Sequence, residues 1–223
     1  RPKKLGLEEA LDLEEYFLDS TCLKANIHFP TDWVLLRDGV RPLMKATWLI
    51  RQAGLRGRMQ PPEEFLRRMN RLSIAMTQQG RRRGSKKGRQ RVLRQRKQLV
   101  GVVRAHARRH RELLDQQWAQ TAWTRPQAAQ ILRRLDGVLE LLPRAQKQAH
   151  ERIIGGRQVA NAEKILSLYE PDVRVIVRGK AGAEVEFGNP VLLGENRQGV
   201  ILDYALFQES APADSQTLFE AII

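Results

Sequence analysis

The sequence contains a single cysteine, Cys22, among 223 residues. One cysteine excludes an internal disulfide framework and any zinc site built from several cysteines. No hydrophobic run approaches the roughly 20 residues that a membrane-spanning helix needs, and no signal peptide is recognisable. We therefore expect a protein of a reducing compartment, the cytoplasm or nucleus by default, with no membrane partner.

Acidic residues are missing from residues 65–111, a window that holds seventeen Lys and Arg residues. The formal net charge of the chain is +14, so the residues outside this window have a net charge of −3. Like charges at this density repel one another in a compact fold unless a polyanion neutralises them, and the usual polyanion is a phosphate backbone. We therefore expect a nucleic-acid partner. A solvated basic helix face without a ligand is the alternative.

The densest part of this window is residues 80–91, GRRRGSKKGRQR. Its glycines favour a loop between two helices. Contacts with phosphates contribute affinity without selecting a base sequence. We expect such contacts from six residues: Arg81, Arg82, Arg83, Lys86, Lys87 and Arg89.

The spacing of apolar residues divides the chain into three zones. In residues 1–30, the run 14–21 (EEYFLDST) predicts a short buried strand that ends near Asp19. Residues 31–162 are predicted to be helical, because apolar residues recur three and four positions apart. Residues 163–223 are predicted to contain strands and a last helix that begins after Asp214. The fold class is therefore mixed α/β, with a large all-helical segment between the strands.

Local signals place the ends of these elements. Thr31 or Asp32 caps a first helix that Pro42 should kink or divide, and Pro61-Pro62 opens a second. A third helix is predicted from about Arg89 to Gln120, and a fourth after Thr124. The strands are predicted at Lys164–Leu168, Val173–Val177, Val185–Leu193 and Val200–Phe207, the last two as a hairpin in which Pro190 requires an edge position or a bulge.

Few side chains are spaced for catalysis or metal binding. His106 and His110 lie one helical turn apart, but the arginines around them favour a basic helix face over a metal site. Asp19 could hold a hard cation such as Mg²⁺ at the margin of a sheet, and two such ions could activate a nucleophile on a phosphodiester. From spacing alone, however, an aspartate after a strand is more often a turn or cap residue.

Two separated passages carry a family resemblance. Residues 18–41, LDSTCLKANIHFPTDWVLLRDGVR, contain an Asp-x-Thr and an Asn-Ile-x-x-Pro-Thr-Asp pattern. Residues 164–207 contain Arg-Gly-Lys at 178–180 and Glu-Phe-Gly at 186–188. In this order, the passages resemble the catalytic region of DDE-type insertion-sequence transposases, and the likeness covers about residues 10–223.

The resemblance implies a ribonuclease H-like core that is interrupted by the helices: residues 1–30 and 163–223 form the core, and residues 31–162 are the insertion. It implies a bacterial, nucleoid-associated protein that uses Mg²⁺ or Mn²⁺ to cleave and join transposon DNA, with homo-oligomers on DNA as a further possibility. Asp19 would be the first acid of the catalytic triad and a metal ligand. Arg178 and Lys180 would lie near the DNA backbone, or would pair with Glu184 or Glu186.

The sequence departs from the family in one respect, because the family's second aspartate and its glutamate would follow Ile223. Asp203 and Asp214 match the hairpin and the helix cap instead. We therefore expect a catalytically incomplete fragment of a transposase. Two alternatives remain: a non-catalytic DNA- or RNA-binding or architectural protein derived from a transposase, and a basic segment that docks or dimerises with protein.

Overall fold

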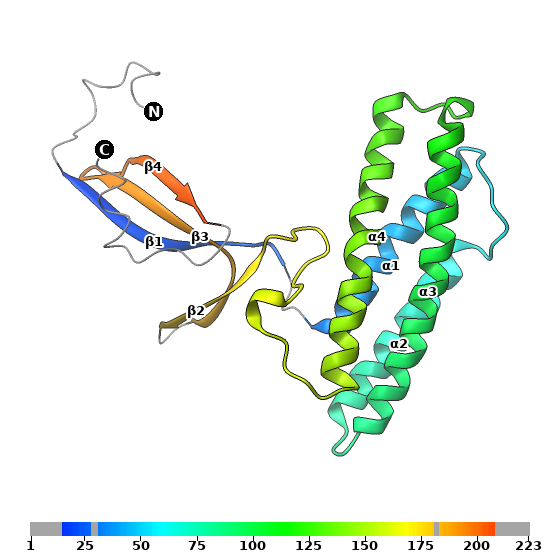
Figure 1. Ribbon diagram of the computed structural model, residues 1–223, viewed down its shortest axis with the longest axis horizontal. Coiled ribbons are helices and arrows are strands. Elements are labelled where there is room, and N and C mark those ends of the chain that lie inside the picture. The colour runs from blue at the N-terminus through cyan, green and yellow to red at the C-terminus, as the bar shows by residue number, and fades with distance from the viewer. Residues whose placement is uncertain (1–14, 28–30, 181–182, 208–223) are drawn as a thin grey trace. The chain divides into compact units, whose positions relative to one another are not determined.

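The computed structural model describes residues 15–27, 31–180 and 183–207, which form four α-helices and four β-strands (Figure 1). The chain divides into two compact units. Residues 28–171 form a helical unit, and residues 1–27 together with 172–223 form a sheet unit. The fold class is mixed α/β, with the helices between the first strand and the other strands in sequence.

The helical unit contains α1 (Asp32–Gln52), α2 (Pro62–Arg81), α3 (Lys86–Gln117) and α4 (Arg125–Ile153). Short 3-10 turns lie at Trp118–Gln120 and Asn161–Glu163. Helix α1 packs against all three other helices, so most of its surface is buried. Apolar stripes from all four helices form one continuous core, as the three- and four-residue spacing predicts.

The predicted starts of the second and fourth helices are confirmed. Pro62 lies in the first turn of α2, where a missing N–H leaves no helical bond unmade. At the start of α4, Thr124 and Gln127 form a reciprocal capping box, in which the Thr124 N–H donates to Gln127 Oε1 at 2.9 Å. No helix of the described residues is long and apolar enough to cross a membrane.

The expectation that Pro42 divides the first helix is wrong, because α1 continues through it to Gln52. A proline inside a helix has no N–H for the carbonyl four residues before it, which here is that of Asp38. The Tyr169 hydroxyl donates a 2.8 Å hydrogen bond to this same carbonyl. A side chain from outside the helix therefore replaces the missing bond.

The sheet unit contains β1 (Tyr16–Lys24), β2 (Arg174–Lys180), β3 (Ala183–Asn196) and β4 (Ile201–Leu206). Strand β3 pairs antiparallel with each of the other three. The predicted hairpin is confirmed as β3 and β4. Its turn is held by Asn196, whose Oδ1 accepts from the Gln198 and Val200 N–H groups, and by Gly199, whose φ of 74° favours glycine.

The edge position predicted for Pro190 is wrong, because β3 is the central strand and Pro190 is paired with Cys22 of β1. Along β3, pairing with β2 ends at Gly188 and pairing with β4 begins at Val191. Pro190 falls between these stretches. Its carbonyl accepts from the Phe207 N–H, and because proline has no N–H the reciprocal bond to Phe207 is missing at the end of the β4 pairing.

The strand predicted at Lys164–Leu168 is absent, although residues 165–168 are buried and Ile165 and Leu168 belong to the core of the helices. A side-chain amide takes the place of a neighbouring strand. The N–H of Ile165 donates to Gln148 Oε1 at 2.8 Å, and Gln148 Nε2 donates to the carbonyl of Ile165 at 3.1 Å. The helix predicted after Asp214 lies outside the described residues.

Candidate nucleic-acid interface

The two units carry opposite net charges. The helical unit has 31 Lys and Arg residues against 11 Asp and Glu residues, a formal net charge of +20. The sheet unit has 8 basic and 14 acidic residues, a net charge of −6. A polyanion is therefore attracted to the helical unit, and the acid-free window forms α2 and most of α3 within it.

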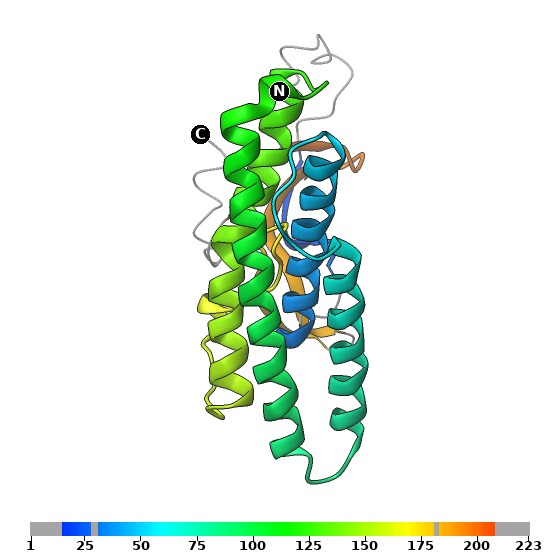
Figure 2. The same ribbon diagram turned by 90° about the vertical axis from the view of Figure 1, so that its right-hand side faces the viewer.

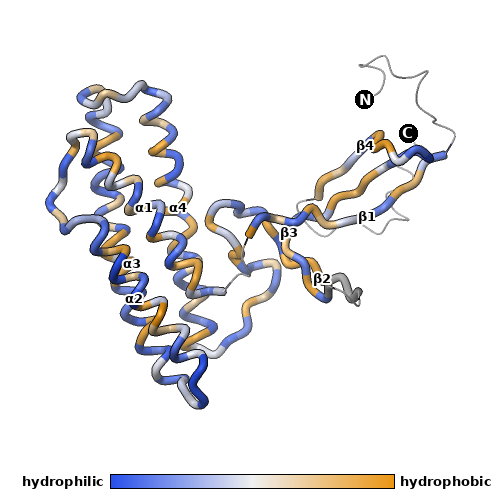
Figure 3. The backbone as a smooth tube through the Cα atoms, turned by 180° about the vertical axis from the view of Figure 1, so that it is seen from behind, coloured by the Kyte–Doolittle hydropathy of each residue, from blue (hydrophilic) through white to orange (hydrophobic). Residues whose placement is uncertain are grey.

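The most basic surface is the connection between α2 and α3. All six residues predicted to contact phosphates are there and are exposed: Arg81, Arg82, Arg83, Lys86, Lys87 and Arg89. We call these six residues the basic tip. Figure 2 shows the α2–α3 connection projecting past the ends of α1 and α4, and Figure 3 shows its hydrophilic character. The tip is therefore open to a large ligand.

Local interactions explain why the chain turns here. Gly84 adopts a φ of 74°, which side chains other than glycine rarely adopt. Ser85 donates its hydroxyl proton to the carbonyl of Gln79 and accepts the Arg89 N–H at its own carbonyl. The tight connection keeps the last turn of α2 and the first turn of α3 close together, so their basic side chains form one cluster.

Ion pairs within the acid-free window occur near its two ends. Among the described residues, Arg67 pairs with Glu64, and Arg111 pairs with Asp115 and Asp136. The hydrogen bonds to Asp136 raise the pKa of Arg111 further. No carboxylate of the described residues pairs with the basic tip, so its charge is available to an external anion.

Arg96 belongs to the acid-free window but is an exception to its basic surface. Its side chain is fully buried between α1, α2 and α3. It donates to Ser73 Oγ at 2.9 Å and to the Trp33 carbonyl, and its guanidinium lies 5.2 Å from the centre of the Trp33 ring. Burial, with Arg37 nearby, lowers the pKa of Arg96 to about 10. The sequence does indicate this burial, because Arg96 falls on the apolar stripe of α3, between Leu93 and Val100.

The His106–His110 pair has a structural role. His110 is fully buried and has the Nδ1–H tautomer, because Nδ1 lies 2.8 Å from the His106 carbonyl. Its Nε2 accepts the N–H of Gly57 at 3.3 Å. Both nitrogens are therefore used within the protein, and His110 fastens the loop after α1 to α3.

This arrangement predicts acid sensitivity. Burial lowers the pKa of His110 most, Arg51, His106 and Arg109 lower it further, and the bond to the His106 carbonyl partly opposes them. The unfolded chain, with a histidine pKa of about 6.5, binds the proton more readily, so stability is complete above about pH 6.5 and falls as the pH decreases. We expect the free energy of unfolding, measured by urea unfolding, to decrease between about pH 7.5 and 5.5. His110→Gln should reduce this dependence and leave the part due to His106, whose pKa burial also lowers. An equal dependence in the variant would contradict the assignment.

The prediction that the first strand ends near Asp19 is wrong. Strand β1 continues to Lys24, so Asp19 lies within it. The strand is also less buried than predicted: Asp19 is exposed, and Phe17 remains 50% exposed. Asp19 is paired with Leu193 of β3, so it lies beside the first strand of the β3–β4 hairpin. Side chains alternate between faces along a strand, and the shared pairing puts Asp19, Leu193 and Tyr204 on one face.

The described residues do not fit the Mg²⁺ site that the resemblance implies. Asp203 is paired with Gly194, which is paired with Leu18, so its side chain is on the face opposite Asp19. Within the described ranges, no group of three or more His, Cys, Asp or Glu side chains could hold a metal ion. Asp19 shares its face of β1 and the hairpin with Glu195, which is paired with Phe17, so the described residues place two carboxylates on this face.

Two residues of the Glu-Phe-Gly motif at 186–188 make contacts inside the sheet unit. Glu186 pairs with Lys24 at 3.1 Å. A Cβ on Gly188 would lie 2.1 Å from the Leu23 carbonyl oxygen, so glycine is required there. Arg178 and Lys180 are on β2, but their side chains lie outside the described part of the structure. Their predicted place near DNA stays a prediction.

The chain was compared with protein-family models, curated protein sequences and solved structures. No protein-family model, no curated protein sequence and no solved structure matches the chain. The candidate interface is therefore argued from the charge, exposure and ion pairs of this chain's own residues.

Proposed function

We propose that this chain is part of a DDE-type transposase and that its helical unit holds DNA through the basic tip. The observation that carries the proposal is the exposure of six Lys and Arg residues at one helix connection without a carboxylate partner among the described residues. Phosphate contacts of this kind give affinity that depends on salt and little on base sequence.

The arrangement of the sheet unit supports the transposase assignment. The resemblance implies a ribonuclease H-like core whose first strand carries an aspartate and lies beside a later hairpin, with helices inserted between them in sequence. Strand β1 carries Asp19 and pairs with β3 of the hairpin, and α1–α4 lie between β1 and β2 in sequence. The ribonuclease H-like topology is part of this proposal.

A second function is favoured because the described residues contain no group of three or more metal-ligating side chains near the hairpin. A non-catalytic DNA- or RNA-binding protein derived from a transposase would keep the basic tip and need no metal site. Both functions require nucleic-acid binding by the helical unit, and the same binding measurement tests this common part.

Substitution of the tip should weaken the salt dependence of binding. In the triple variant Arg81→Gln, Arg82→Gln, Arg83→Gln, three phosphate contacts are lost. We expect the slope of log K against log salt concentration to become less negative by about 2.7, because each contact with duplex DNA contributes about 0.9. Fluorescence anisotropy with a labelled duplex, titrated at several salt concentrations, measures this slope.

A matched control removes the same charge elsewhere. Arg133, Arg134 and Arg144 are exposed on α4, outside the acid-free window. Their triple change to Gln gives a protein of equal net charge, and we expect its slope to stay within about 0.9 of the wild-type slope, the contribution of one contact. Equal slopes in the two variants would show that only net charge matters and would contradict a tip that contacts phosphates.

A further inference from the structure

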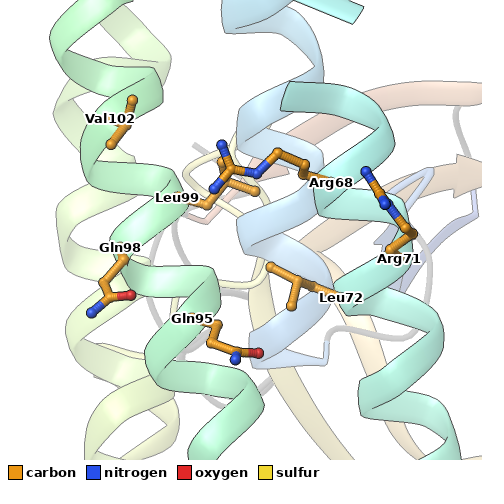
Figure 4. A pocket seen from close by; sticks show the side chains of 7 residues that line it. All are labelled: Arg68, Arg71, Leu72, Gln95, Gln98, Leu99 and Val102. Carbon is orange, nitrogen blue, oxygen red and sulfur yellow. The ribbon is translucent and has the colours of Figure 1, made fainter. Parts of the chain in front are cut away.

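A groove runs between α2 and α3 on the same hairpin that carries the basic tip. Its volume is about 540 Å³, within the range of small-molecule sites. The wall on α2 is formed by Arg68, Arg71 and Leu72, and the wall on α3 by Gln95, Gln98, Leu99 and Val102. Figure 4 shows Arg68 reaching from α2 towards α3, beside Leu99.

The rim of this groove suits an anion. Arg68 and Arg71 are exposed and lie in the acid-free window, and no carboxylate of the described residues pairs with either. They are one helical turn apart on α2 and both line the groove, so each offers guanidinium donors at its rim. Arginine binds phosphate through several N–H donors in a fixed plane, which favours a defined geometry.

The floor of the groove suits a flat, partly apolar group. Leu99 is buried and Leu72 half-buried, while Val102 remains 46% exposed although it is apolar. Gln95 and Gln98, exposed at i and i+3 on α3, each offer an amide donor and an acceptor. An amide pairs with the edge of a nucleobase through this combination. The groove therefore combines groups for a phosphate, an apolar ring face and a base edge.

We propose that this groove binds one unpaired nucleotide of a DNA strand, with its phosphate at Arg68 and Arg71 and its base at Leu99, Val102 and the two glutamines. In duplex DNA the bases are stacked inside and paired, so a recessed floor between two helices cannot reach them, whereas an unpaired base can enter. This inference rests on the proposed DNA binding and adds the form of DNA that the hairpin prefers.

The groove continues the surface of the basic tip. Ten residues separate Arg71 from Arg81 on α2, which corresponds to about 15 Å along a helix. A strand held at the tip through its phosphates can therefore extend along the hairpin to the groove. The tip then contributes affinity for any DNA, and the groove contributes the preference for an unpaired strand.

The test compares labelled single-stranded and duplex DNA of one sequence by fluorescence anisotropy in the presence of EDTA, with the full chain. We expect the double variant Gln95→Ala, Gln98→Ala to lose about tenfold in single-strand affinity, since two hydrogen bonds are removed. Its duplex affinity should stay within about twofold of the wild type. Gln116→Ala with Gln130→Ala, two exposed glutamines outside the groove, is the matched control and should change neither affinity.

Each result has a distinct meaning. An unchanged ratio of single-strand to duplex affinity in Gln95→Ala, Gln98→Ala would overturn the groove while leaving the proposed function intact. Competition by poly-glutamate as effective as that of the single strand would also overturn it, since the groove would then accept a polyanion that has no bases. Failure of every DNA form to bind would instead reject the proposed function. A selective loss for the single strand, absent from the control, supports the inference.

Discussion

Gln148→Leu is expected to lower the free energy of unfolding of the helical unit by about 3 kcal/mol, the largest loss among the predicted effects. Gln148 is buried on α4 and makes three hydrogen bonds, two to the backbone of Ile165 and one to Asp32 Oδ1 at 2.8 Å. Leucine keeps the volume but leaves the N–H and the carbonyl of Ile165 without partners. Each buried group left unpaired costs about 1–3 kcal/mol.

The Asp32 carboxylate connects this network to the start of α1. Arg152 Nη1 lies 2.9 Å from both Asp32 oxygens, so Asp32 accepts bonds from Arg152 and Gln148 together. Loss of Gln148 should therefore loosen the beginning of α1, the end of α4 and residues 165–168 at once. Asp32 belongs to the Pro-Thr-Asp pattern that resembles the transposase motif, and the structure gives this residue a role in stability.

Urea unfolding followed by the helical circular dichroism signal measures this loss. Gln146→Leu is the matched control, because Gln146 is half-buried on the same helix and makes one long hydrogen bond, 3.5 Å, to the Lys97 carbonyl. It should cost less than about 1 kcal/mol. Faster amide exchange at residues 165–168 should accompany Gln148→Leu. Similar stabilities for the two variants would show that the Gln148 network contributes little.

The helices could be predicted from the sequence because their signals are local. Pro62 with two acids, and Thr124 with Gln127, fix helix starts through neighbours a few residues away. The β3–β4 hairpin was predictable for the same reason, since Asn196 and Gly199 shape its turn within the turn itself. The basic tip needed only the charge pattern and the glycines.

The errors concern partners that are distant in sequence. The apolar run 165–168 has strand composition, but its hydrogen-bond partner is the side chain of Gln148. Pro42 frees a carbonyl that Tyr169, 127 residues later, satisfies. No local pattern reveals either contact. The groove glutamines also escaped prediction, because a groove exists only once α2 and α3 are packed together.

Arg96→Met is expected to raise the free energy of unfolding by about 1–2 kcal/mol, the largest gain among the predicted effects. Arg96 is buried without a carboxylate bonded to it, and its pKa near 10 corresponds to a cost on the order of 3 kcal/mol for holding the charge inside the fold. Methionine keeps most of the length and flexibility of the stem and removes that cost. The lost contact with the Trp33 ring offsets part of the gain.

We expect the free energy of unfolding to rise and not to fall, because both hydrogen-bond partners of Arg96 keep another bond in the Arg96→Met variant. The Ser73 hydroxyl still donates to the Met69 carbonyl at 2.9 Å, and the Trp33 carbonyl lies within α1, where it also accepts the helical bond. Arg96→Ala should instead lose about 2 kcal/mol, since it leaves a cavity among three helices. Urea unfolding of both variants separates charge from volume. A loss in both would mean that the hydrogen bonds of the buried guanidinium outweigh its desolvation, and that α1, α2 and α3 depend on a buried cation for their packing.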